Sequence, residues 1–191
     1  MQSRPKTAMV LGAGLGQRMR PLTNDLPKPL VKLAGRPMID FVLDTLERAG
    51  VETIVVNVHY LADKLEAHLR RRAGVRVVIS DERAALLDTG GAVVKAMHLL
   101  GPGPFYIHNS DSISMGGLGR NLGRLADAFD PSTMDTMLLL ASSASALGYG
   151  GSGDFLLSGN GVISRRPERS VAPFVFTGAS IATPELFNDA P

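Results

Sequence analysis

The sequence predicts an α/β fold, a Rossmann-like, mostly parallel sheet with helices on both faces. Short apolar runs alternate repeatedly with segments whose apolar residues recur at helical spacing, which is typical of βαβ units. A length of 191 residues, 45% of them hydrophobic, suits one domain with a substantial core. We therefore expect a single domain over residues 1–191, with parallel strands joined by right-handed crossovers.

The expected elements follow this alternation in chain order. The first strand is the apolar run 8–11, which leads into a glycine-rich loop. A helix is expected over 39–49, where apolar residues recur at helical spacing and Gly50 follows as a stop signal. The next strand and helix pairs are 53–58 with 61–69, 75–79 with 92–100, 105–107 with 118–129, and then a strand at 136–140.

The composition changes after residue 140. Residues 141–153 are mostly Ser, Ala and Gly, which is typical of a loop. Short β-like pieces follow at 154–157 and 174–181, separated by glycine turns. We expect these pieces to form a small antiparallel, substrate-covering part near the C-terminus.

Charge and cysteine content exclude several function classes. The net charge is +2 and the basic residues are mostly dispersed, unlike the basic surface of a nucleic-acid-binding protein. The chain has no cysteine, which excludes disulfides, thiolate metal sites and cysteine nucleophiles. The apolar run 8–11 is too short for a signal peptide, and no stretch reaches the ~18 apolar residues of a membrane helix. We expect a cytoplasmic protein without nucleic-acid or membrane partners, and monomer and homodimer both stay open.

The loop at 11–23 combines glycines with arginines directly after the first strand. Glycines let the backbone approach a ligand and direct N–H groups at phosphate oxygens. The loop fits neither the dinucleotide fingerprint nor the Walker A motif, because Gln17 occupies a position where each requires glycine. A purely structural glycine turn is the alternative. Arg18 and Lys28, the latter held between two prolines, add two charges that suit a triphosphate.

The sequence around this loop closely resembles the signature of the sugar-1-phosphate nucleotidyltransferase family, whose fold is GT-A-like. The resemblance lies in Leu11-Gly12-Ala13-Gly14-Leu15-Gly16-Gln17-Arg18-Met19-Arg20-Pro21-Leu22-Thr23, Pro27-Lys28-Pro29-Leu30 and Leu33-Ala34-Gly35-Arg36-Pro37-Met38-Ile39. It extends through Asp88-Thr89-Gly90-Gly91-Ala92, Asn109-Ser110-Asp111, Gly153-Asp154-Phe155 and Phe176-Thr177-Gly178. Within the family, the chain is most similar to small N-acetylmuramate-1-phosphate uridylyltransferases and relatives labelled mannose-1-phosphate guanylyltransferases.

The resemblance implies a reaction between a nucleoside triphosphate and a sugar 1-phosphate that yields a nucleotide sugar and pyrophosphate. UTP with N-acetylmuramate 1-phosphate is the expected pair. Mannose-1-phosphate guanylyl transfer and glucose-1-phosphate thymidylyl or uridylyl transfer are alternatives. The competing classes are a nucleotide-binding module without transferase activity and a nicotinamide-dependent oxidoreductase, which the misplaced third glycine disfavours.

The resemblance also implies roles for particular residues. Nucleotide-binding roles carry over to Leu11, Gly12, Ala13, Gly14, Gly16, Arg18, Lys28 and Gly90. The implied catalytic residues are Arg18, Lys28 and Asp111, and Asp111 is also the implied ligand of Mg²⁺. This ion binds one or two carboxylates together with substrate phosphates. Asn109 is expected to contact the sugar or the ribose, and Asp154 the sugar. The segment 87–91 can form a helix N-cap turn and serve nucleotide binding at the same time.

Members of the family continue beyond the segment that matches residues 186–187. The continuation includes a tryptophan-containing stretch and usually a second metal-binding aspartate. This sequence contains no tryptophan and stops at Pro191. We therefore expect a C-terminally truncated domain, in which Asp111 supplies one of two metal-binding carboxylates.

Overall fold

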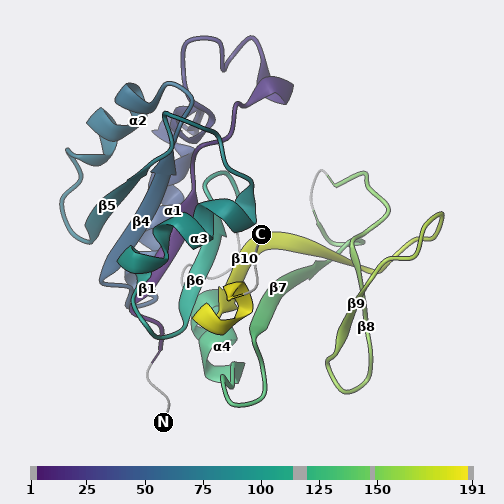
Figure 1. The fold of residues 1–191 in the computed structure, drawn as a ribbon. Coiled ribbons are helices and arrows are strands. Elements are labelled where there is room, and N and C mark those ends of the chain that lie inside the picture. Colours follow the sequence, from purple (N-terminus) through teal and green to yellow (C-terminus); the bar gives the residue numbers. More distant parts are fainter. Residues whose placement is uncertain (1–3, 114–119, 147–148, 189–191) are drawn as a thin grey trace.

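The computed structural model describes residues 4–113, 120–146 and 149–188. Its main sheet has the strand order β5-β4-β1-β6-β10-β8-β9, and β7 pairs with β10 outside this path (Figure 1). These strands are β1 (Thr7–Leu11), β4 (Thr53–Val58), β5 (Arg76–Asp81), β6 (Phe105–Asn109), β7 (Thr136–Ser142), β8 (Phe155–Leu157), β9 (Ile163–Arg165) and β10 (Phe174–Ala182). A separate hairpin consists of β2 (Lys32–Leu33) and β3 (Arg36–Pro37).

The sheet has a parallel half and an antiparallel half. Strands β5, β4, β1 and β6 are parallel neighbours, in the order of a Rossmann-like half-sheet. Strand β10 is antiparallel to β6, β7 and β8, and β9 is antiparallel to β8. The α/β class and the antiparallel C-terminal part are therefore confirmed. The sheet is more evenly mixed than the sequence predicts.

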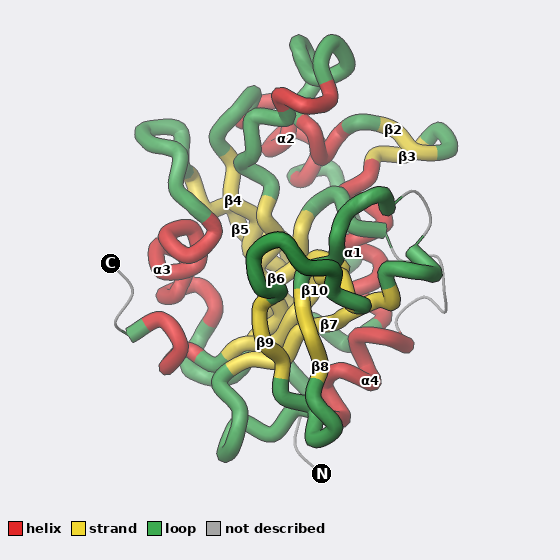
Figure 2. The backbone as a smooth tube through the Cα atoms, turned by 90° about the vertical axis from the view of Figure 1, so that its right-hand side faces the viewer, coloured by secondary structure: helices red, strands yellow, loops and turns green. Residues whose placement is uncertain are grey.

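Helices cover both faces of the parallel strands, as predicted (Figure 2). On one face, α1 (Met38–Arg48) and α2 (Ala62–Leu69) share a hydrophobic core with strand residues such as Val10 and Ile54. Helix α4 (Arg120–Ala128) extends this core beside β7 and β10. On the other face, α3 (Thr89–Leu100) packs against Met9 and Val55. Successive strand residues point to opposite faces, so a strand that is apolar at every position joins both layers of the core.

Several short elements differ from the sequence prediction. The structure contains the 3-10 helices η1 (Gln17–Met19), η2 (Lys28–Leu30) and η3 (Pro184–Phe187), besides the β2–β3 hairpin and β9. These segments are too short to show an apolar period. Helix α3 begins at Thr89 and so includes two glycines that the prediction left outside it. Residues 118–119 of the expected helix 118–129 and residues 147–148 of the expected loop lie outside the described residues.

Strand β10 carries an irregularity where it passes the end of β6. Its register with β7 shifts between Phe176 and Ser180. Gly178 within this bulge has a φ of 81°, and a Cβ there would overlap Ser112 and the side-chain amide of Asn109. Glycine is therefore required where β10 crosses the carboxyl end of β6.

Among the described residues, no helix is long and apolar enough to cross a membrane.

Candidate active site

The glycine loop after β1 lies against the backbone of β4. A Cβ at Gly12 would come within 2.9 Å of the carbonyl oxygen of Asn57 and 3.2 Å of Val56 Cγ1, so only glycine fits. The N–H of Gly12 donates to Asn57 Oδ1 at 2.7 Å. Further along, Gly16 has a left-handed φ of 64°, and its carbonyl accepts a hydrogen bond from Thr23 Oγ1 at 2.7 Å. The loop is thus held at both ends.

The middle of this loop has free backbone donors. The N–H groups of Ala13, Gly14 and Leu15 form no hydrogen bond with any of the described residues. A Cβ at Gly14 would meet nothing within 4 Å, so the backbone there is open to a ligand. Successive unpaired N–H groups in a loop of this kind form an anion-binding concavity.

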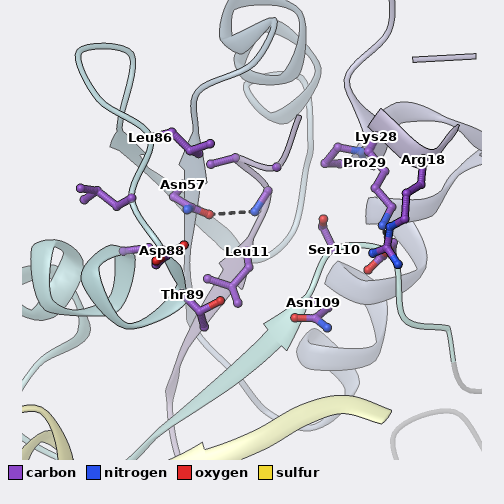
Figure 3. Close-up of a pocket in the computed structure, with 16 residues that line it drawn as sticks. Leu11, Arg18, Lys28, Pro29, Asn57, Leu86, Asp88, Thr89, Asn109 and Ser110 are labelled. Carbon is purple, nitrogen blue, oxygen red and sulfur yellow. Dashed lines mark hydrogen bonds and ion pairs between the residues drawn. The ribbon is translucent and has the colours of Figure 1, made fainter. Parts of the chain in front are cut away.

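Two cationic side chains face this concavity. Lys28 lies in η2 between Pro27 and Pro29, which are both buried. Its ammonium group pairs with the carboxylate of Asp111, just beyond the end of β6, and these side chains are 26% and 28% exposed. The guanidinium of Arg18 forms no ion pair with any residue in the described ranges, and it extends toward the same end of the pocket as Lys28 (Figure 3).

These groups line a pocket of about 440 Å³ at the carboxyl ends of β1, β4 and β6. This is the edge of an open α/β sheet at which ligands bind, and the volume lies in the range of small-molecule sites. The lining residues are Leu11, Gly12, Ala13, Gly14, Arg18, Lys28, Pro29, Asn57, Leu86, Leu87, Asp88, Thr89, Ala92, Asn109, Ser110 and Asp111.

The opposite wall of the pocket is the segment Leu86–Thr89 and the first turn of α3 (Figure 3). Asp88 occupies the N-cap position, as the alternative interpretation of this segment predicts, but its side chain forms no capping hydrogen bond. The first N–H groups of a helix have no partner within the helix and can bind polar ligand atoms. The pocket therefore offers neutral donors at this wall and positive charge at the other.

The structure brings together most of the residues that the sequence singles out. Leu11, Gly12, Ala13, Gly14, Arg18, Lys28, Asn109 and Asp111 all line the pocket. Gly16, Gly90 and Asp154 are not among the lining residues. Gly16 shapes the loop, and Gly90 is exposed in the first turn of α3. One carboxylate oxygen of Asp154 accepts a hydrogen bond from the N–H of Phe176 at 2.9 Å. Their ligand-binding roles stay predictions.

Sequence reasoning missed the polar residues at the base of the pocket. Asn57 lines it from the end of β4 and is 3% exposed. Ser110 lies beside Asp111 and is 5% exposed. The signal for Asn57 is a single amide within a strand of apolar and β-branched residues, at the strand end where ligands bind.

One histidine lies beneath the site and faces away from water. His108 is 6% exposed, and burial lowers its pKa below the ordinary value of 6.5. Its Nδ1 lies 2.7 Å from the carbonyl oxygen of Asn109, so the neutral ring donates a hydrogen bond to that carbonyl. The interaction fixes the backbone on which the pocket residues Asn109 and Ser110 are carried.

Comparison with known proteins agrees with this geometry. The family described as Nucleotidyl transferase matches residues 7–151, which include the glycine loop, Lys28 and Asp111. The chain belongs to this family. It is 49% identical over 195 residues to an N-acetylmuramate alpha-1-phosphate uridylyltransferase of Caulobacter vibrioides, an alignment covering 100% of this chain and 81% of the relative.

Other members of the Nucleotidyl transferase family match over a shorter part. An N-acetylmuramate alpha-1-phosphate uridylyltransferase of Neisseria meningitidis is 42% identical over 109 residues, covering 56% of this chain and 47% of the relative. A mannose-1-phosphate guanylyltransferase catalytic subunit beta of Xenopus tropicalis is 37% identical over 111 residues, covering 56% and 31%. These are the two groups that the sequence resembles.

Solved structures share the fold at low sequence identity. The inositol-1-phosphate CTP transferase of T. maritima superposes with a TM-score of 0.78 at 20% identity, covering 98% of this chain and 74% of that chain. A UDP-glucose pyrophosphorylase complexed with UDP-glucose gives 0.76 at 17% identity, covering 95% and 77%. The mixed sheet described above is therefore the fold of known nucleotidyltransferases.

Proposed function

We propose that this protein transfers uridylyl from UTP to N-acetylmuramate α-1-phosphate and releases pyrophosphate. The observation that carries the proposal is the convergence of loop N–H groups, Arg18, Lys28 and Asp111 in one pocket. Full-length similarity to the Caulobacter uridylyltransferase supports these substrates over mannose 1-phosphate and GTP. We also propose that residues 1–191 belong to one nucleotidyltransferase domain.

The two walls of the pocket favour one orientation of the nucleotide. The base would lie along Leu86–Thr89, where the first turn of α3 offers neutral donors. The triphosphate would follow the N–H groups of Ala13 and Gly14 toward Arg18 and Lys28. The sugar phosphate would then enter near Asn109, with its phosphate close to the same two cations.

The chemistry follows from charge. An oxygen of the sugar phosphate attacks the α-phosphorus, a new P–O bond forms, and the bond to the oxygen that bridges to the β-phosphorus breaks as pyrophosphate leaves. The attacking oxygen is already ionised near neutral pH, so the step needs no general base. Repulsion between anions is the main obstacle, and Arg18, Lys28 and the loop N–H groups offset it.

The donor set of the pocket fits a magnesium ion that arrives with the nucleotide. Among the described residues, no group of three or more His, Asp or Glu side chains converges, whereas Mg²⁺ requires only one or two carboxylates when phosphates supply further ligands. Asp111 would hold the ion, and its ion pair with Lys28 supports this role, because the carboxylate already faces a positive charge. Bound there, Mg²⁺ would neutralise phosphate charge.

The substrates also favour a place in the cell. UTP and sugar phosphates are used in the cytoplasm, and N-acetylmuramate is a sugar of peptidoglycan. We therefore propose a cytoplasmic enzyme that returns this cell-wall sugar to nucleotide-sugar synthesis, which is a peptidoglycan-recycling role.

Pyrophosphate release with UTP, GTP, CTP and dTTP, each combined with the 1-phosphates of N-acetylmuramate, mannose and glucose, tests the proposal. We expect the highest kcat/KM for UTP with N-acetylmuramate α-1-phosphate. A preference for GTP with mannose 1-phosphate, or for glucose 1-phosphate, would replace these substrates with the corresponding alternative. Nucleotide binding without pyrophosphate release from any pair would instead indicate a nucleotide-binding module.

A further inference from the structure

Two polar side chains are buried together at the base of the pocket, where Asn57 lines it and Glu82 lies outside the lining. Asn57, at the end of β4, is 3% exposed, and Glu82, which directly follows β5, is 0% exposed. The N–H of Glu82 donates to the carbonyl of Val58 at 2.8 Å, so the backbone of Glu82 continues the pairing of these strands. Burying an amide and a carboxyl group is costly unless each polar atom is hydrogen-bonded. Their partners therefore explain why they are there.

The partners form one continuous chain of hydrogen bonds. The N–H of Gly12 donates to Asn57 Oδ1 at 2.7 Å. Asn57 Nδ2 donates to Glu82 Oε1 at 2.9 Å. The N–H of Leu87 donates to the other oxygen, Glu82 Oε2, at 3.3 Å. The chain begins at the glycine loop and ends at the opposite wall of the pocket, with Asn57 between the two walls (Figure 3).

The link to Leu87 adds a directional bond to a wall that is otherwise held by packing of the Leu87 side chain and by the hydrogen bond from Ala92 N–H to the carbonyl of Asp88. Within the described ranges, this is the hydrogen bond that ties residues 86–88 back to the sheet, and Leu86 and Asp88 are exposed. His59 Nδ1 contacts the carbonyl oxygen of Glu82 at 2.7 Å, which fixes the backbone from which the carboxylate extends.

We propose that Asn57 and Glu82 are positioning residues, which set the spacing between the glycine loop and the Leu86–Thr89 wall so that both engage one nucleotide. The inference deepens the proposed function and rests on its nucleotide site. The residue types fit this role. The amide of Asn57 accepts from Gly12 on Oδ1 and donates to Glu82 from Nδ2, and a carboxylate accepts on both of its oxygens.

This bonding pattern can be satisfied by exchanging the two functional groups. In the double variant Asn57→Asp/Glu82→Gln, the aspartate accepts from Gly12 N–H and from the glutamine Nε2, while the glutamine Oε1 accepts from Leu87 N–H. Each single variant breaks the chain. Asn57→Asp opposes two carboxylates, and Glu82→Gln turns an N–H group toward either Asn57 Nδ2 or the N–H of Leu87.

The test measures UTP binding by calorimetry without sugar phosphate, and the KM of each substrate during turnover. We expect each single variant to weaken UTP binding about tenfold or more, because the broken chain no longer holds the two walls at the spacing that one nucleotide needs. The KM for sugar 1-phosphate should change much less. The double variant should recover most of the loss. Glu52→Gln, the same substitution at an exposed position just before β4, should bind UTP like wild type.

Two results would overturn the inference. One is that both single variants bind UTP with wild-type affinity and unfold at the wild-type temperature. The other is that the double variant folds but binds UTP no better than the weaker of the two single variants. If the single variants fail to fold, the double variant decides, since it must both fold and bind. Failure of the wild type to bind any nucleoside triphosphate would instead remove the proposed function itself, which separates the two failures.

Discussion

Replacing Lys28 with alanine should lower nucleotidyl transfer about a hundredfold. The ammonium group lines the pocket beside Asp111, and the side chain is 26% exposed. Two unit charges about 4 Å apart interact by about 4 kcal/mol at the effective dielectric near a protein surface. Water screens the ammonium group, and Arg18 still neutralises part of the phosphate charge when Lys28 is removed. We therefore take about two thirds of this value as the loss of transition-state stabilisation. About 2.7 kcal/mol corresponds to a hundredfold change in rate.

The assay is kcat/KM from pyrophosphate release, with circular dichroism as a check of folding. Lys32→Ala is the matched control, because it removes the same charge from an exposed position in the β2–β3 hairpin outside the pocket. Lys28→Arg should fall between wild type and alanine, since the charge stays but the planar guanidinium has a different shape. A folded Lys28→Ala variant within fivefold of wild type would refute the assignment.

Three further predictions concern the glycine loop, His108 and the metal. Gly12→Ala should destabilise the fold by about 1–3 kcal/mol, because its Cβ meets the backbone of β4. Gly14→Ala should leave the free energy of unfolding unchanged, because a Cβ there meets nothing. Equal denaturation midpoints for the two variants would contradict this prediction. Burial lowers the pKa of His108 below 6.5, so the unfolded chain binds more protons and stability should decrease as pH falls below about 6.5. When urea unfolding is measured between about pH 5 and pH 8, the free energy of unfolding of His108→Gln should decrease less towards low pH than that of wild type. The same pH dependence in both proteins would exclude His108 as the cause. In the wild type, chelation with EDTA should abolish nucleotidyl transfer and added Mg²⁺ should restore it. Asp111→Asn should stay about a hundredfold or more slower at any Mg²⁺ concentration. Normal turnover of this variant would exclude Asp111 as a ligand.

Much of the parallel half of the fold could be predicted from sequence, because its signals are local. The β-branched run at 53–58 coincides with β4, and the helical period at 39–49 with α1. Where glycines interrupt the pattern, prediction was less accurate. Gly90 and Gly91 disfavour a helix by their own propensity, yet α3 begins at Thr89, since packing of Ala92 and Val93 on the sheet overrides local preference.

The candidate site divides in the same way. The glycine loop, Lys28 and Asp111 lie in motifs whose residues are close in sequence, and they meet in the pocket as expected. The pairing of Asn57 with Glu82 spans 25 residues and depends on the register of two neighbouring strands. Neither residue belongs to a sequence motif that contains the other. The pair can therefore be identified only once the pairing of the two strands is known.

The place of β10 bears on how the chain reaches this state during synthesis. Strand β6 has β1 as one neighbour and gains its other neighbour, β10, only after residues 174–182 have left the ribosome. Until then, the nascent nucleotide-binding half carries an unpaired sheet edge at β6. Such an edge is a template for pairing with other chains. Slow translation between β7 and β10, or proteolysis there, should therefore leave the edge of β6 free to pair with other chains and aggregate. Rapid synthesis of β10 protects this edge.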